Sequence, residues 1–353
     1  MSKLKKISIV VDDFYFENNL FDKRVKDLNF FVKIKKFFRE NGIEISTQDI
    51  ISPNDADIII YNDYRKKYQI IDKTHILLAL ESIAVKPNNF NKKNEIFDYV
   101  FTWKTSLVDN KRVFQIYYSY DLDYSKYYPF QKKNKFMCNI TANKFSNHKK
   151  ELYTERVKVL EFFKNYPDLF HLYGYGWDRP YKYPYIYKIF KFFNKNKILR
   201  LVSKVLERAF ILFGLEGLIY KKYSIYQGTI EDKLEVLKDY KFSLCFENVA
   251  DEDTYITEKI FDCFKVGTVP IYLGSSNIKK IIPSNTFIDY RDFNDVEELF
   301  ENLKSINNKE FEIFQKNIKD YLDSDKINLF SSNDNAKFFV EKIIDNYNKS
   351  QDA

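Results

Sequence analysis

The residues best suited to chemistry in this sequence lie where a short apolar run ends and a helical pattern begins. The apolar run leads directly into Glu247 and Asn248, and Thr257, Glu258 and Lys259 open the helical pattern soon afterwards. Thr is a favourable N-cap and Glu suits the positive end of a helix dipole, whereas a Lys in the first turn opposes that dipole. Such a lysine is better tolerated when an anion binds there. The pattern therefore predicts an anion site, against the alternative of a surface lysine in an ordinary strand–helix unit.

The elements that must position these residues predict an α/β fold. Short apolar runs alternate with amphipathic helical patterns, as expected for buried parallel strands covered by helices on both faces. The expected strands span residues 7–11, 57–61, 75–80, 99–102, 136–140, 241–246, 268–273 and 286–290, and residues 114–120 are also strand-like. The expected helices span residues 22–41, 149–165, 257–266, 296–305, 309–322 and 335–348.

A polar stretch near residue 133 predicts a domain boundary. We expect residues 1–133 to form one Rossmann-like domain and residues 134–325 a second one, with residues 326–353 as a tail helix that docks back. Two such units in tandem leave a cleft between them, which is a usual place for a ligand.

Residues 179–222 interrupt the second domain with a basic, aromatic insertion. Between positions 179 and 206 the sequence has eight basic residues and no acidic one, interleaved with Tyr, Ile, Phe and Leu. Basic residues recur every three or four positions over residues 188–195 and again over residues 197–208, which predicts a pair of basic amphipathic helices. Two interpretations stay open: a solvated face packed on the protein, or attachment to the anionic inner leaflet of a membrane.

Composition excludes several classes of protein. The net charge of +7 comes without an arginine-rich arm, zinc-finger spacing or an RNA-binding motif, so we expect no nucleic-acid partner. The three cysteines are far apart in apolar surroundings, which favours buried thiols in a reducing compartment. The beginning of the chain has no signal-peptide pattern and no apolar run is long enough to span a bilayer. We therefore expect a cytoplasmic protein, with the inner face of the cytoplasmic membrane as the alternative location.

A longer stretch around the opening motif resembles a known family. Its segments FEN, YITEK, GTVPIYLG and PSNTFID follow one another over about fifty residues. Their order is similar to the donor-binding signature of glycosyltransferase family 10, the α-1,3/1,4-fucosyltransferases, in their bacterial form. The loop between Asn248 and Tyr255 is one residue longer than that signature. The resemblance implies a GT-B fold, with two Rossmann-like domains facing a central cleft.

The resemblance continues upstream more sparsely. The segment LLALESIAVKPNNF is similar to the family's Glu-Ser-Pro stretch, which implies that Glu81 is the general base, although Ile83 replaces the proline. The segment around Arg156 is similar to a helix whose arginine contacts the donor diphosphate. The family signature further implies that Asn248 and Lys259 contact the diphosphate, and that Tyr255 and Glu258 hold ribose or sugar hydroxyls.

The reaction implied by this resemblance is an inverting transfer of L-fucose from GDP-fucose to a surface-glycan hydroxyl of a lipopolysaccharide or capsule type. It needs no cofactor and no bound metal, with a divalent ion at most stimulating product release. The partners implied are a GDP-sugar donor and an oligosaccharide or glycolipid acceptor. Two alternatives remain: a related transferase that uses another GDP-activated deoxysugar, and an inactive glycan- or nucleotide-binding protein.

Overall fold

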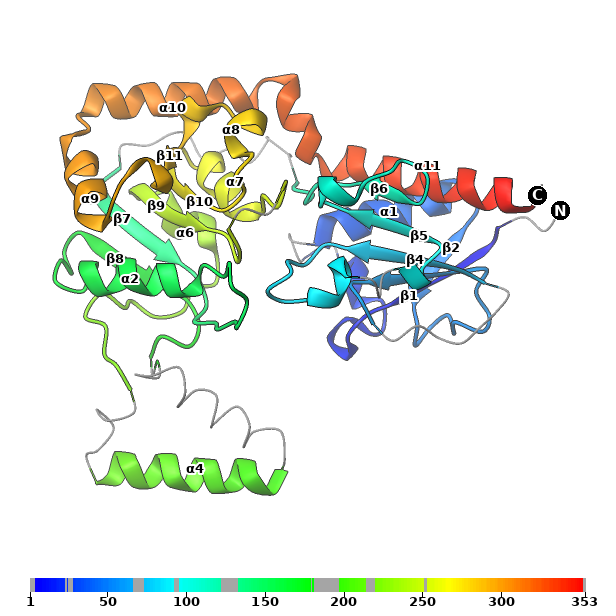
Figure 1. The fold of residues 1–353 in the computed structure, drawn as a ribbon, viewed down its shortest axis with the longest axis horizontal. Coiled ribbons are helices and arrows are strands. Elements are labelled where there is room, and N and C mark those ends of the chain that lie inside the picture. Colours follow the sequence, from blue (N-terminus) through cyan, green and yellow to red (C-terminus); the bar gives the residue numbers. More distant parts are fainter. Residues whose placement is uncertain are drawn as a thin grey trace.

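The structure is a computed structural model of the 353-residue chain. It describes residues 4–22, 24, 28–65, 73–91, 95–121, 133–178, 180, 197–213, 220–250 and 253–351. Two α/β domains lie side by side, and the long last helix runs from one towards the far end of the other (Figure 1).

The N-terminal domain is built on one parallel sheet. Its strands are β1 (Lys6–Val10), β2 (Glu44–Thr47), β3 (Ile58–Asn62), β4 (Thr74–Ala79), β5 (Tyr99–Thr102) and β6 (Val113–Gln115). They pair in the order β2-β1-β3-β4-β5-β6, and every pair is parallel. Residues 58–61 and 76–79 are buried on both faces of the sheet, which explains their continuous apolar runs. Helix α1 (Asn29–Glu40) covers one face through Phe30, Phe31, Ile34 and Phe38.

The C-terminal domain repeats this plan. Its strands are β7 (Lys135–Ile140), β8 (Phe170–Tyr173), β9 (Tyr240–Phe246), β10 (Val269–Leu273) and β11 (Ile288–Asp289). They form a parallel sheet in the order β11-β10-β9-β7-β8. The helices of this domain are α2 (Tyr153–Phe163), α6 (Lys233–Leu237), α7 (Glu258–Lys265), α8 (Ile278–Ile281), α9 (Val296–Ser305) and α10 (Asn308–Leu322). The first strand of each sheet lies between the second and the third, so each sheet has a point where the strand order reverses.

The chain crosses between the domains twice, and the two crossing segments pair with each other. The Tyr120 N–H donates to the Phe330 carbonyl at 2.8 Å, and the Ser332 N–H donates to the Tyr120 carbonyl at 2.9 Å. The last helix, α11 (Ser332–Gln351), then packs on the N-terminal domain. The ring of its Phe339 packs edge-on against the ring of Phe101, with the ring centroids 4.6 Å apart.

Helix α4 (Lys197–Leu212) lies apart from both sheets (Figure 1). It overlaps the second of the two helices expected from the basic insertion. The first expected helix cannot be compared, because residues 179 and 181–196 lie outside the described residues. No helix in the described part of the chain is long and apolar enough to cross a membrane.

Several expected boundaries are wrong, for local reasons. The helix expected from residue 22 begins at Asn29, and the strand expected over residues 286–290 contracts to a two-residue β11 between 3-10 turns. The strand-like run 114–120 pairs in the sheet only as β6, up to Gln115, because its later residues form the crossing segment. Strands β2 and β8, of four residues each, were not expected.

Candidate active site

A cavity of about 450 Å³ opens at the carboxyl ends of β7 and β9. These neighbouring strands are the point where the strand order of the C-terminal sheet reverses. Open α/β sheets bind ligands in the crevice at this position, because the connections leave the sheet in opposite directions there. The cavity wall includes Arg156, Asn248, Tyr255, Glu258 and Lys259, and Glu81 and Tyr118 border it from the other domain. The structure thus brings all the sequence-predicted site residues to one cavity.

Arg156 ties together the strand ends that form the floor of the cavity. It lies on α2 and is 4% exposed. Its NH2 group donates to the carbonyls of Phe246 at 2.5 Å and Glu247 at 2.6 Å, and its NH1 group donates to Thr141 Oγ1 at 3.1 Å. Burial lowers the pKa of the guanidinium from its ordinary value, but arginine remains a cation throughout the physiological range. The same side chain therefore supports the floor and supplies positive charge to it.

The start of α7 already holds an anion, which is the carboxylate of Glu247. This side chain is fully buried, and its oxygens accept from the Thr257 N–H at 2.8 Å and the Thr257 hydroxyl at 2.8 Å. Thr257 occupies the expected N-cap position, but its side chain does not cap the helix. The Glu247 side chain fits here because residue 274 is a glycine. A Cβ atom at Gly274 would lie 2.5 Å from Glu247 Cγ and would clash with it.

Lys259 is balanced by two carboxylates. Its Nζ lies 3.1 Å from Glu247 Oε2 and 3.7 Å from Glu258 Oε1, and it donates to Thr257 Oγ1 at 2.8 Å. Burial opposes its charge, but Glu247 and Glu258 outweigh burial and raise its pKa. Burial likewise opposes ionisation of Glu258, yet the nearby Lys259 and Lys233 cations help to lower its pKa to about 2. The lysine in the first turn is therefore stabilised by the protein itself, before any ligand binds.

Tyr255 joins the two domains beneath the cavity. Its ring packs against Trp103 of the N-terminal domain, with the ring centroids 4.9 Å apart, and Tyr255 is 2% exposed. Its hydroxyl accepts from Asn248 Nδ2 at 3.3 Å. Burial raises the pKa of the phenol, and the Glu81 and Glu247 charges raise it further. Tyr255 is thus a neutral phenol at the domain interface.

Glu81 faces these groups from the N-terminal domain, just beyond the end of β4. Its side chain is partly buried, and the structure gives its carboxylate no hydrogen bond or ion pair among the described residues. Burial raises its pKa above the ordinary value, the Asp63 carboxylate raises it further, and Lys144 and Lys259 lower it. A carboxylate with free acceptor oxygens and a raised pKa has the properties of a general base.

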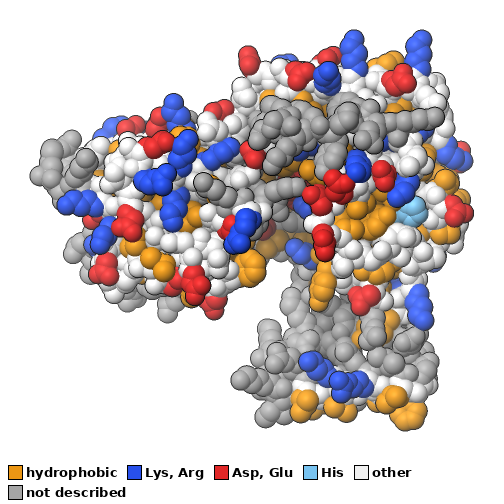
Figure 2. Space-filling view, turned by 180° about the vertical axis from the view of Figure 1, so that it is seen from behind, with side chains coloured by type: hydrophobic (Ala, Val, Ile, Leu, Met, Phe, Trp, Pro, Cys, Tyr) orange, Lys and Arg blue, Asp and Glu red, His pale blue; other side chains and the backbone are white. Residues whose placement is uncertain are grey.

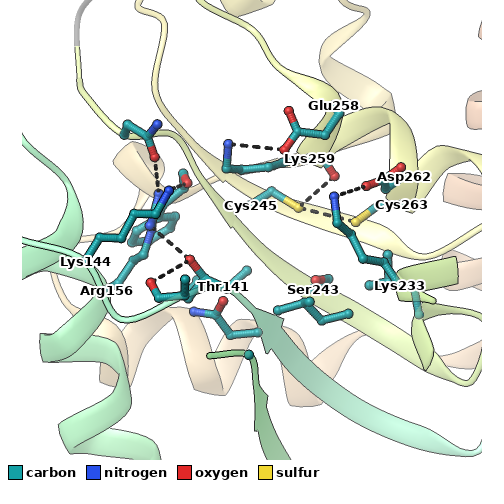
Figure 3. A pocket seen from close by; sticks show the side chains of 18 of the residues that line it. Thr141, Lys144, Arg156, Lys233, Ser243, Cys245, Glu258, Lys259, Asp262 and Cys263 are labelled. Carbon is teal, nitrogen blue, oxygen red and sulfur yellow. Dashed lines mark hydrogen bonds and ion pairs between the residues drawn. The ribbon is translucent and has the colours of Figure 1, made fainter. Parts of the chain in front are cut away.

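Two further residues of the cavity were missed by the sequence analysis. Lys144 follows β7 and borders the same hollow as Arg156 and Lys259 (Figure 3). Asn139, at the end of β7, is 1% exposed and borders the cavity, and its Nδ2 has no partner among the described residues. A buried amide without a partner is costly, so a ligand that accepts from it would remove that cost. The available signal was the position of Asn139 near the end of the strand predicted over residues 136–140, and of Lys144 shortly after it.

Asp121 is the last described residue of the first crossing segment, since residues 122–132 lie outside the described residues. The Asp121 carboxylate accepts from Asn29 Nδ2 at 2.7 Å and lies 3.4 Å from Lys33 Nζ. These contacts tie the crossing segment to α1.

Comparison with solved structures identifies the class of the fold. An α1,3-fucosyltransferase with GDP aligns over 98% of this chain and 92% of its own, with a TM-score of 0.55 and 16% identity. The Anabaena protein HepE, in complex with UDP and glucose, aligns over 96% of this chain with a TM-score of 0.53 and 9% identity. The chain therefore has the GT-B fold, as the sequence predicted.

The C-terminal half of the chain is similar to a known family. Residues 217–322 match the family model described as "Glycosyltransferase family 10 (fucosyltransferase) C-term". An α-(1,3)-fucosyltransferase of Helicobacter pylori is 39% identical over 75 residues, which is 21% of this chain and 16% of that protein. A putative fucosyltransferase-like protein of Arabidopsis thaliana is 45% identical over 74 residues, or 14% of its length. The likeness to glycosyltransferase family 10 therefore covers residues 217–322, and the chain matches less than a quarter of the length of these two relatives.

Proposed function

We propose that this protein is an inverting glycosyltransferase that transfers L-fucose from GDP-fucose to a hydroxyl of a surface glycan, of the lipopolysaccharide or capsule type. The observation that carries this proposal is that one cavity joins the basic floor of the C-terminal domain to Glu81, a carboxylate without a hydrogen bond or ion pair in the described part of the chain. The family domain and its fucosyltransferase relatives support the choice of donor.

The proposed reaction is one displacement. Glu81 accepts the proton of the acceptor hydroxyl, the acceptor oxygen bonds to the anomeric carbon from the face opposite the nucleotide, and the bond from that carbon to the phosphate oxygen breaks. The electron pair leaves with GDP, so charge grows on the diphosphate. Because Lys259 is already balanced by Glu247 and Glu258, we expect Arg156 and Lys144 to neutralise much of this charge. No metal or cofactor takes part in this proposal.

A donor screen tests the proposal. Release of the nucleoside diphosphate is measured against galactose- and glucosamine-containing acceptors: GDP from GDP-fucose, other GDP-deoxysugars and GDP-mannose, and UDP from UDP-sugars. Acceptor-dependent GDP release is expected to be fastest with GDP-fucose. Faster turnover with another GDP-deoxysugar would replace the donor, and GDP binding without turnover of any donor would indicate a binding protein.

We further propose that the protein attaches to the anionic inner face of the cytoplasmic membrane through α4. The exposed fractions of Leu201, Val205 and Leu212 on one face of this helix are 66%, 58% and 83%. At 100° per residue, the exposed Lys204 and Arg208 flank this apolar face on one side. Figure 2 shows hydrophobic side chains along the outer edge of this projecting region, with Lys and Arg side chains beside them. An apolar face bordered by cations suits an interface rich in anionic lipid.

Vesicle sedimentation tests this attachment. The protein is expected to bind vesicles that contain phosphatidylglycerol at low salt, and a Leu201→Asp/Val205→Asp variant should lose at least about 10-fold in affinity because the apolar face no longer inserts. Ile313→Asp is the matched control, since Ile313 is an apolar residue on α10 that is 51% exposed. Absence of binding to anionic vesicles at low salt would contradict the proposal.

A further inference from the structure

The turn that carries Glu81 is held by buried side chains on both sides. The N–H groups of Leu80 and Glu81 each donate to Asp63 Oδ1 at 2.9 Å. The Leu80 carbonyl accepts from Trp103 Nε1 at 2.9 Å, and the Glu81 carbonyl accepts from Asn89 Nδ2 at 3.3 Å. Every backbone polar group of these two residues therefore has a side-chain partner, although both residues lie beyond the end of β4.

Asp63 is the centre of this arrangement. It directly follows β3, the neighbour of β4, and adopts a φ of 61°, a left-handed conformation that is uncommon for a residue other than glycine. It is 6% exposed, and its Oδ1 also accepts from Asn89 Nδ2 at 2.8 Å. Asn89 Oδ1 in turn accepts from the Tyr64 N–H at 2.6 Å. An uncommon backbone conformation and a buried carboxylate each cost free energy, so their occurrence at one position suggests a function. Here both direct the Asp63 carboxylate towards the Glu81 turn.

We infer that Asp63 is a positioning residue for Glu81, fixing the backbone from which the base reaches the acceptor and placing a negative charge behind it. This inference rests on the proposed function, because it takes Glu81 as the base. Preorganised support of this kind holds a catalytic group in its productive geometry without reorganisation during the reaction.

The charge of Asp63 gives this role a signature that simple structural support would not have. Glu81 acts as a base only when ionised, so activity is lost as the pH falls through its pKa. Burial raises that pKa, Asp63 and Glu258 raise it too, and the facing Lys144 and Lys259 lower it. Burial raises the pKa of Asp63 itself, and the hydrogen bonds from the Glu81 N–H, Asn89 Nδ2 and the Leu80 N–H lower it, as does the facing Lys86 cation. Removing only the Asp63 charge should therefore lower the pKa of Glu81 and move the acid limb of the activity profile to lower pH.

The test compares Asp63→Asn with the wild-type protein. Asparagine keeps an acceptor oxygen and tolerates a positive φ, so the turn can persist without the charge. We expect kcat to fall about 10-fold with KM for GDP-fucose nearly unchanged, and the acid limb of kcat/KM to move down by about half a pH unit or more. Asn89→Ala, which keeps the Asp63 charge, should lower kcat without moving the limb downward.

Asp57→Asn is the matched control, because Asp57 accepts the Lys5 and Lys6 N–H groups at 2.8 and 2.9 Å at the opposite end of β3. It should leave the pH profile in place. The Glu81 carboxyl is also titrated by ¹³C NMR, assigned with Glu81→Gln, in wild type and Asp63→Asn. The NMR titration can be measured without turnover. If the wild-type protein transfers no fucose, the proposed function is refuted, but the effect of Asp63 on the Glu81 pKa can still be tested. An unmoved Glu81 titration, or an unchanged kcat and acid limb in Asp63→Asn, overturns the inference.

Discussion

Glu81→Gln is expected to lower the rate of fucosyl transfer at least about 10²-fold, the range for loss of a general base. Glutamine has the same shape as glutamate but cannot accept the proton of the acceptor hydroxyl. The Glu81 carboxylate has no hydrogen bond or ion pair among the described residues, so its replacement breaks no observed side-chain contact. Its backbone contacts to Asp63 and Asn89 persist in the variant.

The two readouts of this variant should separate chemistry from binding. GDP affinity, measured by calorimetry, is expected to stay the same or to rise slightly, because the variant removes a negative charge that faces the diphosphate site. Glu44→Gln, at the start of β2, is the control and should retain full activity. A Glu81→Gln protein that keeps more than about a tenth of the wild-type rate would exclude Glu81 as the base.

The parts of the site that the sequence predicted are those encoded by short-range pattern. Residues 257–259 could be placed at a helix start at the carboxyl end of a strand, because an apolar run followed by a helical pattern defines both positions. The same pattern predicted two parallel-sheet domains. Strands β2 and β8 escaped prediction because polar residues leave them no continuous apolar run: β2 reads EIST and β8 reads FHLY, whereas the equally short β5 reads YVFT.

The parts that escaped prediction depend on contacts between distant segments. The sequence suggested an anion at the start of α7, but it could not show that Glu247 supplies one, because this requires the direction of a side chain at the end of β9. Lys144 and Asn139 reach the cavity only because β7 pairs with β9, about one hundred residues later in the chain. The role of Asp63 could not be predicted for the same reason, since its contact with the Glu81 turn depends on the pairing of β3 with β4.

Glu247→Gln is expected to lower the free energy of unfolding by about 3 kcal/mol, because it leaves the Lys259 cation without its buried partner. The Glu247 side chain is fully buried and that of Lys259 is 24% exposed, so water cannot replace the lost contact completely. The same change leaves the α7 helix start more positive. We therefore expect GDP to bind more tightly to the less stable protein, a separation of stability from affinity that few other positions in the cavity should show.

The double variant Glu247→Gln/Lys259→Met tests whether the effect comes from the Lys259 cation, which keeps only the more distant Glu258 carboxylate in the single variant. It should regain much of the lost stability, because the cation that lost its buried partner is gone and Lys233 still faces Glu258, while its GDP affinity should fall below that of wild type. Asp292→Asn is the control, because it breaks an exposed ion pair in which Lys279 Nζ lies 2.8 Å from Asp292 Oδ1. It should lower the free energy of unfolding by less than about 1 kcal/mol. Urea unfolding and GDP calorimetry measure both quantities. A Glu247→Gln protein with a wild-type unfolding midpoint, or a double variant less stable than the single one, would show that Glu247 does not stabilise Lys259.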